Sequence, residues 1–125
     1  LGARLVHTYR ANLEQIGRLA LAYGFDAYVV YQPNGLLDLN NPFIKDAADY
    51  AKSSEYLLVA SMQAAVRTAI AQGELHMVDL SQERPAYVDL AHYSDTGNKA
   101  LATSILQGMS RGALRVFRPG SAPEP

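Results

Sequence analysis

Two short runs of apolar, β-branched and aromatic residues constrain the fold of this chain more than any other feature. They cover residues 26–31 and 75–80, and neither shows the polar–apolar alternation of a half-exposed strand. Both therefore predict strands buried on both faces, which is typical of a parallel sheet. The first run stops at residues 32–35 (QPNG), where proline, asparagine and glycine favour a turn.

Three amphipathic helices and one helical turn are predicted around these runs. In each helix, apolar side chains recur at three- and four-residue steps, so that they share one face. Gly24 and Gly73 follow the first two helices and suit the left-handed conformation in which many helices end. The predicted helices cover residues 5–23, 54–72 and 96–110, and the helical turn covers residues 44–51.

The order helix, strand, helix, strand, helix predicts an α/β fold with right-handed crossovers and a parallel sheet. Two strands are too few for three helices, and residues 114–117 offer only a weak third candidate. We therefore expect part of a flavodoxin-like, three-layer α/β/α sandwich whose N-terminal strands are missing. Residues 1–117 would form this C-terminal half, and the Pro-rich residues 118–125 a flexible tail.

Composition excludes several classes of function. Eleven basic against twelve acidic residues give a net charge of −1, so the chain has no basic surplus for nucleic acid or anionic lipid. Its apolar runs are too short to span a membrane. The absence of cysteine removes disulfides and thiol nucleophiles. Three dispersed histidines and no glycine-rich phosphate loop predict neither a metal nor a cofactor. Localisation stays undetermined.

Asp89 and His92 are the candidate catalytic residues, three positions apart on a predicted loop. A carboxylate at this spacing can accept a hydrogen bond from the imidazole and fix its tautomer. The other ring nitrogen can then take a proton from a nucleophile. On this spacing alone, a loop acid beside a solvated histidine is the more common explanation, and a pair of metal ligands is a third.

Residues 89–102 (DLAHYSDTGNKALA) resemble the last conserved block of the SGNH (GDSL-type) hydrolases, which are α/β/α-sandwich esterases and lipases. Residues 9–13 (YRANL), 29–34 (VVYQPN) and 77–80 (MVDL) are similar to segments of that family in the same order. The resemblance implies that Asp89 orients His92, which acts as general base on a small ester substrate. Three further residues would flank the catalytic loop and could line a substrate pocket, although turn chemistry or surface exposure is the more common explanation for each: Gln32, Asn34 and Tyr93.

The chain also departs from this family. It contains no Gly-Asp-Ser sequence for the nucleophile and no convincing counterpart of the glycine and asparagine oxyanion donors. Ser94 adjoins His92 but is better placed as a helix cap. We therefore expect a C-terminal half that supplies the Asp–His pair and is inactive by itself. Its partner would be the missing N-terminal half, or a second copy, pairing at the edge of strand 26–31. The alternative is a complete, non-catalytic flavodoxin-like domain for binding or interaction, in which Asp89 and His92 are incidental.

Overall fold

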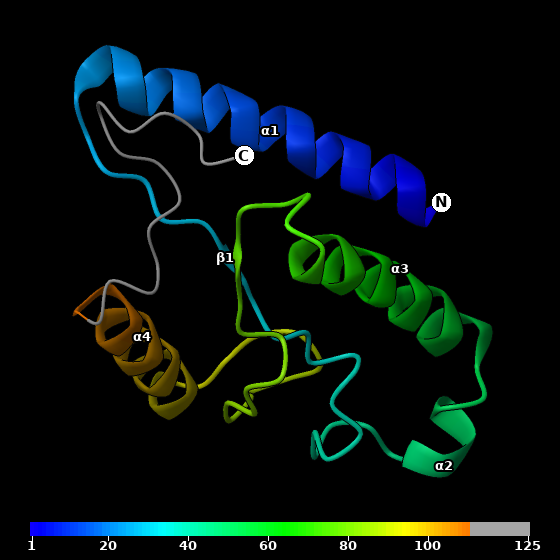
Figure 1. Cartoon of the computed structure of the whole chain (residues 1–125). Helices are drawn as coiled ribbons and strands as arrows, with labels where there is room; N and C mark the ends of the chain where they lie inside the picture. The colour runs from blue at the N-terminus through cyan, green and yellow to red at the C-terminus, as the bar shows by residue number, and fades with distance from the viewer. Residues whose placement is uncertain (111–125) are drawn as a thin grey trace.

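The computed structural model describes residues 1–110, which form a mostly helical fold around a minimal sheet (Figure 1). Helix accounts for 55% of the structure and strand for 6%. The weak strand candidate at 114–117 and the expected tail at 118–125 lie outside the described residues. The elements are, in order, α1 (Gly2–Tyr23), β1 (Val30–Tyr31), α2 (Ala47–Tyr50), α3 (Ser54–Ala71), β2 (Val78–Asp79) and α4 (Asp95–Ser110).

The sheet is where the structure departs most from the sequence prediction. β1 and β2 pair in parallel, with Val30 opposite Val78 and Tyr31 opposite Asp79. Within residues 1–110 neither strand has a further neighbour. The predicted partial three-layer α/β/α sandwich of flavodoxin-like, SGNH hydrolase type is therefore wrong, since the chain is mostly helical with only two parallel strands.

Within residues 1–110 the two apolar runs pair only with each other, and the ladder covers two residues of each. A ladder extends only as far as both backbones stay in hydrogen-bonding register. The remaining apolar residues of the runs are used for packing instead. Leu75 belongs to the core, and Val29 and Met77 pack against it. The predicted burial on both faces was also wrong: in the two runs only Leu75 is buried, Asp26 and His76 are exposed, and the remaining residues are half-buried.

The helix ends follow the sequence signals. Gly24 adopts a left-handed φ of 71° after α1, and its N–H donates to the carbonyl oxygen of Ala20 at 2.9 Å. Gly73 adopts a φ of 74° after α3. At the start of α3, the Ser53 hydroxyl accepts a hydrogen bond from the Tyr56 N–H at 3.1 Å. Left-handed glycine and capping serine therefore set these boundaries.

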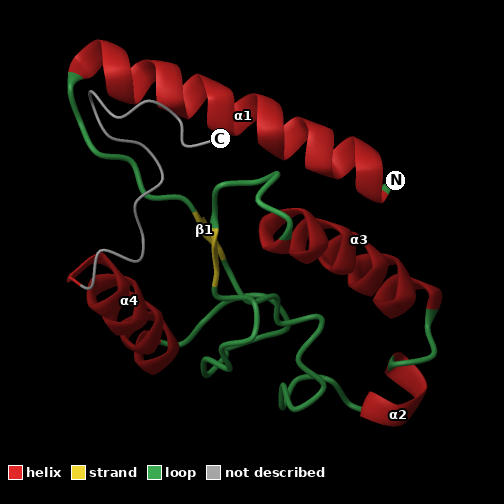
Figure 2. Ribbon diagram, in the orientation of Figure 1, coloured by secondary structure: helices red, strands yellow, loops and turns green. Residues whose placement is uncertain are grey.

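The core lies where α1 packs along α3 on one face of the short sheet (Figure 2). Leu13 of α1 is buried there with Val66 and Ala69 of α3. The helices approach so closely near the N-terminus that a Cβ atom at Gly2 would lie 2.8 Å from the Cβ atom of Ala65. Of the helices in the described part of the chain, none is long and apolar enough to cross a membrane.

α4 lies across the strands from α1 and α3 (Figure 1). Its first turn rests directly on the loop that follows β2. A Cβ atom at Gly97 would lie 2.2 Å from the carbonyl oxygen of Ala86, so only glycine permits this approach. The contact fixes the end of the loop that carries the predicted catalytic residues.

Candidate functional site

The site is built from the two loops that leave the carboxyl ends of β1 and β2. In a parallel pair these ends lie at the same edge of the sheet, which is where open α/β sheets place their ligands. The two loops are joined directly, because the Tyr93 hydroxyl donates a hydrogen bond to the carbonyl oxygen of Pro33. Residues that follow the first strand are thereby held against the predicted catalytic loop.

Two tyrosines close the catalytic loop, which comprises residues 87–93 and carries the predicted catalytic residues. Tyr87 and Tyr93 form an antiparallel bridge, and their ring centroids are 5.5 Å apart. The Val88 N–H donates to the carbonyl oxygen of His92 at 2.9 Å. The segment between the two tyrosines therefore forms a tight turn, called the catalytic turn below, which contains Asp89 and His92.

Asp89 accepts three hydrogen bonds, two of them from His92 and one from Ala91. Its Oδ1 atom accepts from the backbone N–H groups of Ala91 at 2.8 Å and His92 at 2.7 Å. Its Oδ2 atom lies 2.8 Å from His92 Nδ1. These bonds, first those of the Ala91 and His92 backbone and then that of the ring, lower the pKa of Asp89 from 3.8 to about 2. The carboxylate is therefore ionised and can only accept, which places the proton on Nδ1.

This pair is open to solvent. The side chain of His92 is 79% exposed and that of Asp89 is 53% exposed. With Nδ1 protonated, Nε2 carries a free lone pair on the exposed ring. The arrangement can take a proton from an incoming hydroxyl group, and the carboxylate would stabilise the imidazolium that forms.

Asn41 forms hydrogen bonds to the catalytic turn, and the sequence did not predict it as a site residue. Its side chain is 2% exposed. Its Nδ2 group donates to the carbonyl oxygen of Gly35 at 3.2 Å and reaches those of Asp89 and Leu90, each at 3.4 Å. Its Oδ1 atom accepts from the Phe43 N–H at 3.1 Å. One buried amide thus ties the long loop to the catalytic turn, and the Asn-Asn-Pro sequence at 40–42 was its only signal.

Gly35 completes this support by lying directly against the catalytic turn. A Cβ atom at this position would lie 2.4 Å from the carbonyl oxygen of Leu90. The close approach, and not an unusual φ, is what requires glycine here. The loop after β1 therefore packs closely against the backbone of Asp89 and Leu90.

A cleft of about 730 Å³ opens beside His92. Three other predicted site residues, Gln32, Asn34 and Tyr93, line it together with His92, whereas Asp89 lies behind the ring and does not. Apolar residues of α1 and α3, and the residue just before β2, also line it: Leu5, Tyr9, Val59, Met62 and Met77.

Two of these polar residues already have structural roles. The Asn34 Oδ1 atom accepts a hydrogen bond from the Leu36 N–H at 3.0 Å. This is a turn contact, the explanation that the sequence offered for Asn34 in place of ligand binding. The Tyr93 hydroxyl is bonded to Pro33. Gln32 is exposed, so its amide is the one of the three most open to a ligand.

No serine among residues 1–110 lines this cleft. Ser94 is a helix cap, as the sequence predicts, because its hydroxyl oxygen accepts from the Gly97 N–H at 3.1 Å and its hydroxyl donates to the carbonyl oxygen of Ala86. The described residues also contain no group of three or more potential metal ligands. Within residues 1–110, the predicted base therefore has no serine beside it in the cleft.

Comparison with protein-family models, curated proteins and solved structures found no significant match to this chain. The chemistry of the site therefore rests on its own geometry. That geometry places the hydrogen-bonded Asp89–His92 pair beside a cleft that is lined by both polar and apolar side chains.

Proposed function

We propose that Asp89 and His92 are the acid–base pair of a serine ester hydrolase. The observation that carries this proposal is the 2.8 Å contact between Asp89 Oδ2 and His92 Nδ1, made by a carboxylate whose pKa is about 2. A carboxylate that stays ionised fixes one tautomer of the imidazole and leaves Nε2 as the base. The 730 Å³ cleft beside the ring offers room for a small ester.

In the proposed reaction, His92 Nε2 removes the proton of a serine hydroxyl while the serine oxygen attacks the carbonyl carbon of the ester. The imidazolium then gives that proton to the leaving alcohol as the bond between acyl carbon and alkoxy oxygen breaks. A water molecule attacks the resulting acyl-serine with the same help, which releases the acid and restores the serine. No redox partner or metal takes part in any of these steps.

The serine would come from an N-terminal half of the protein that pairs along the edge of β1 facing away from β2, which has no strand partner within residues 1–110. The carbonyl groups of Val29 and Tyr31 accept hydrogen bonds from the residues of the β2 segment. Because backbone groups alternate along a strand, the N–H and C=O of Val30 point to the opposite edge. Val30 also lines the cleft with His92, so a strand added there would end next to the imidazole.

The resemblance to SGNH hydrolases supports ester chemistry through particular residues. The Asp-x-x-His spacing at positions 89–92 coincides with a bonded pair in the fold. The segments at 29–34 and 77–80, similar to family segments, contribute lining residues of the same cleft. The likeness bears on this chemistry alone, since the sandwich architecture does not apply.

A serine-directed fluorophosphonate probe tests the proposal. The tagged chain would be produced in the cells that encode it, recovered with the polypeptides bound to it, and treated with the probe. We expect one labelled serine, either in associated polypeptide or in a part of the protein beyond residues 1–110. Labelling should fall by several orders of magnitude in His92→Asn, because the general base is lost.

His7→Asn is the matched control, since this exposed histidine of α1 does not line the cleft, and it should label normally. Labelling that is independent of His92, or no labelled serine either in the protein or in any polypeptide bound to it, would contradict the proposal. The second result would favour the alternative, a binding or interaction domain without catalysis.

A further inference from the structure

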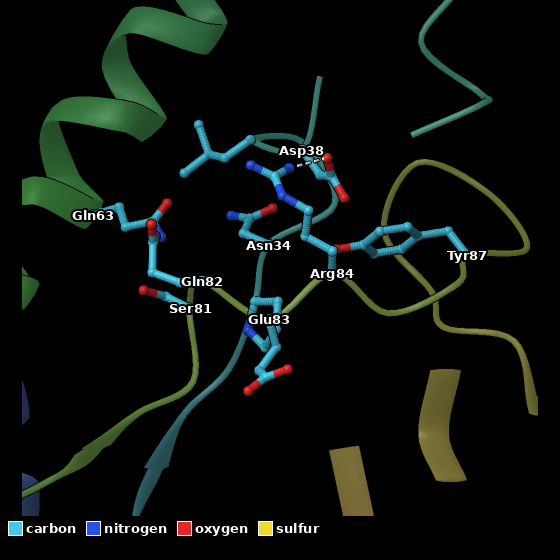
Figure 3. A pocket seen from close by; sticks show the side chains of 10 residues that line it. Asn34, Asp38, Gln63, Ser81, Gln82, Glu83, Arg84 and Tyr87 are labelled. Carbon is cyan, nitrogen blue, oxygen red and sulfur yellow. Dashed lines mark hydrogen bonds and ion pairs between the residues drawn. The ribbon is translucent and has the colours of Figure 1, made fainter. Parts of the chain in front are cut away.

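A second, smaller cavity lies between the same two loops, away from the acid–base pair. Its volume is about 70 Å³, and Figure 3 shows its lining. Neither Asp89 nor His92 contributes to it. Its lining is mostly polar, with Pro33 and Leu37 as the apolar members; the polar side chains include Asn34, Asp38, Gln63, Ser81, Arg84 and Tyr87.

The Tyr87 hydroxyl is the most informative group in this cavity. The Tyr87 residue is only 8% exposed, and its hydroxyl oxygen is fully buried with no hydrogen-bond partner within the described residues. Burial raises the pKa of Tyr87 to about 12, so the group is a neutral hydroxyl that can both donate and accept. Buried polar groups almost always have a partner, so this one indicates a molecule that occupies the cavity.

The charges of the lining argue against an anionic occupant. Arg84 forms an ion pair with Asp38 (Figure 3), so its positive charge is already matched. Glu83 also lines the cavity, which makes the surroundings unfavourable for an anion. What remains available are hydroxyl and amide groups, including the side chain of Gln63 on α3.

We propose that this cavity binds a hydroxyl-bearing arm of a neutral polyhydroxy compound, a polyol or a sugar. Its volume admits a few water molecules or a hydroxymethyl-sized fragment, and not a whole monosaccharide. A ligand hydroxyl can accept a hydrogen bond from Tyr87 and donate one to an amide oxygen at the same time. The rest of the ligand would lie outside, over Gln82 and Gln63, both of which line the cavity.

Side-chain amide signals in nitrogen–proton correlation NMR spectra provide a direct test, because Asn34, Gln63 and Gln82 each carry a reporter NH₂ group. The full chain would be titrated with glycerol and with a methyl glucoside, and in parallel with inorganic phosphate and acetate. We expect saturable shifts of these amides and of the backbone around Ser81 with the two polyhydroxy compounds, with Kd values in the millimolar range. The two anions should produce none.

Tyr87→Phe removes only the buried hydroxyl and should weaken polyol binding by about tenfold. Gln63→Met is a second variant, on a different element, that should also weaken it. Tyr23→Phe is the matched control, because Tyr23 is 75% exposed at the end of α1, and it should bind as the unaltered chain does.

Flat titrations with both polyhydroxy compounds, which would mean that the cavity holds only water, would overturn the proposal. So would shifts caused by phosphate alone, or binding that Tyr87→Phe leaves intact. Because Asp89 and His92 are not part of the cavity, any of these results would leave the proposed acid–base function standing.

Discussion

The hydroxyl of Tyr93 donates a hydrogen bond to the carbonyl oxygen of Pro33, 60 positions away in the sequence. It joins the loop that follows β2 directly to the loop that follows β1. Together with the Asn41 amide, which reaches the carbonyl oxygens of Asp89 and Leu90, this phenol group holds the turn that carries Asp89 and His92 beside the cleft.

Tyr93→Phe should lower the free energy of unfolding by about 1 kcal/mol, which is typical of one lost intramolecular hydrogen bond. Its ring can still pack against Tyr87, so the loss reports the hydroxyl alone. Urea denaturation followed by circular dichroism measures it. Tyr23→Phe should be close to neutral, and equal losses in the two variants would contradict the assigned role.

The carboxyl group of Asp89 should titrate with a midpoint near 2 instead of 3.8. Since its pKa is lower in the folded state than in the unfolded state, its stabilising contribution is fully present above pH 3.8. That contribution is lost as the pH falls towards 2. Carbon-detected NMR of the carboxyl group measures the midpoint.

His92→Ala provides a sharper test of what lowers this pKa. The largest contributions come from the backbone N–H groups of Ala91 and His92, and the variant retains both. We expect the Asp89 midpoint to rise but to stay below 3.8. A return to the ordinary value would show that the imidazole, and not the backbone of the turn, holds the carboxylate ionised.

Asn41→Ala should destabilise the fold by about 1–3 kcal/mol, because it leaves buried carbonyl and N–H groups without their partner. Asn41→Asp should cost more, since it would bring a carboxylate against the carbonyl oxygens of Gly35, Asp89 and Leu90. Thermal and urea unfolding measure both losses. A stable Asn41→Asp variant would contradict the donor role of the amide.

Gly35→Ala should also lower stability by about 1–3 kcal/mol through overpacking, since the new methyl group would meet the Leu90 carbonyl oxygen. Gly73→Asn is a useful comparison. Gly73 has open space around its Cβ position and a φ of 74°, which asparagine tolerates better than most residues. We expect a smaller loss there, and a larger one would be inconsistent with steric fit at Gly35.

The 125-residue chain alone should show no His92-dependent turnover of a simple aryl ester. The proposed nucleophile is not part of the described residues, and loss of a serine nucleophile reduces the rate by several orders of magnitude. Initial rates of unaltered chain and His92→Asn should coincide. A clear difference between them would mean that a nucleophile lies within the chain itself.

The sequence predicted the helices well because their signals are local. Apolar periodicity, Ser53 and the two left-handed glycines each act within a few residues of the helix that they bound. The strands were overestimated because strand length depends on a partner elsewhere in the chain. Apolar character in residues 26–31 and 75–80 predicted packing against the core, which Val29, Leu75 and Met77 make, but it overestimated both the burial and the extent of pairing.

The candidate site was predictable to the same degree. His92, Gln32, Asn34 and Tyr93 do meet at one cleft, since residues after parallel strands gather at one edge. Asn41 and Tyr87 were not predictable, because their burial depends on how one loop folds beneath another. A contact between two loops leaves no periodic pattern in the sequence from which it could be predicted.

Pro33 and Asn34 line both the large cleft and the small polar cavity. One short stretch of backbone therefore forms part of the wall of each. Any ligand that shifts this wall from one side alters the shape presented on the other, so the two sites would be thermodynamically linked. Such linkage is reciprocal: the factor by which a polyol in the cavity changes affinity in the cleft must equal the factor by which a cleft ligand changes affinity for the polyol.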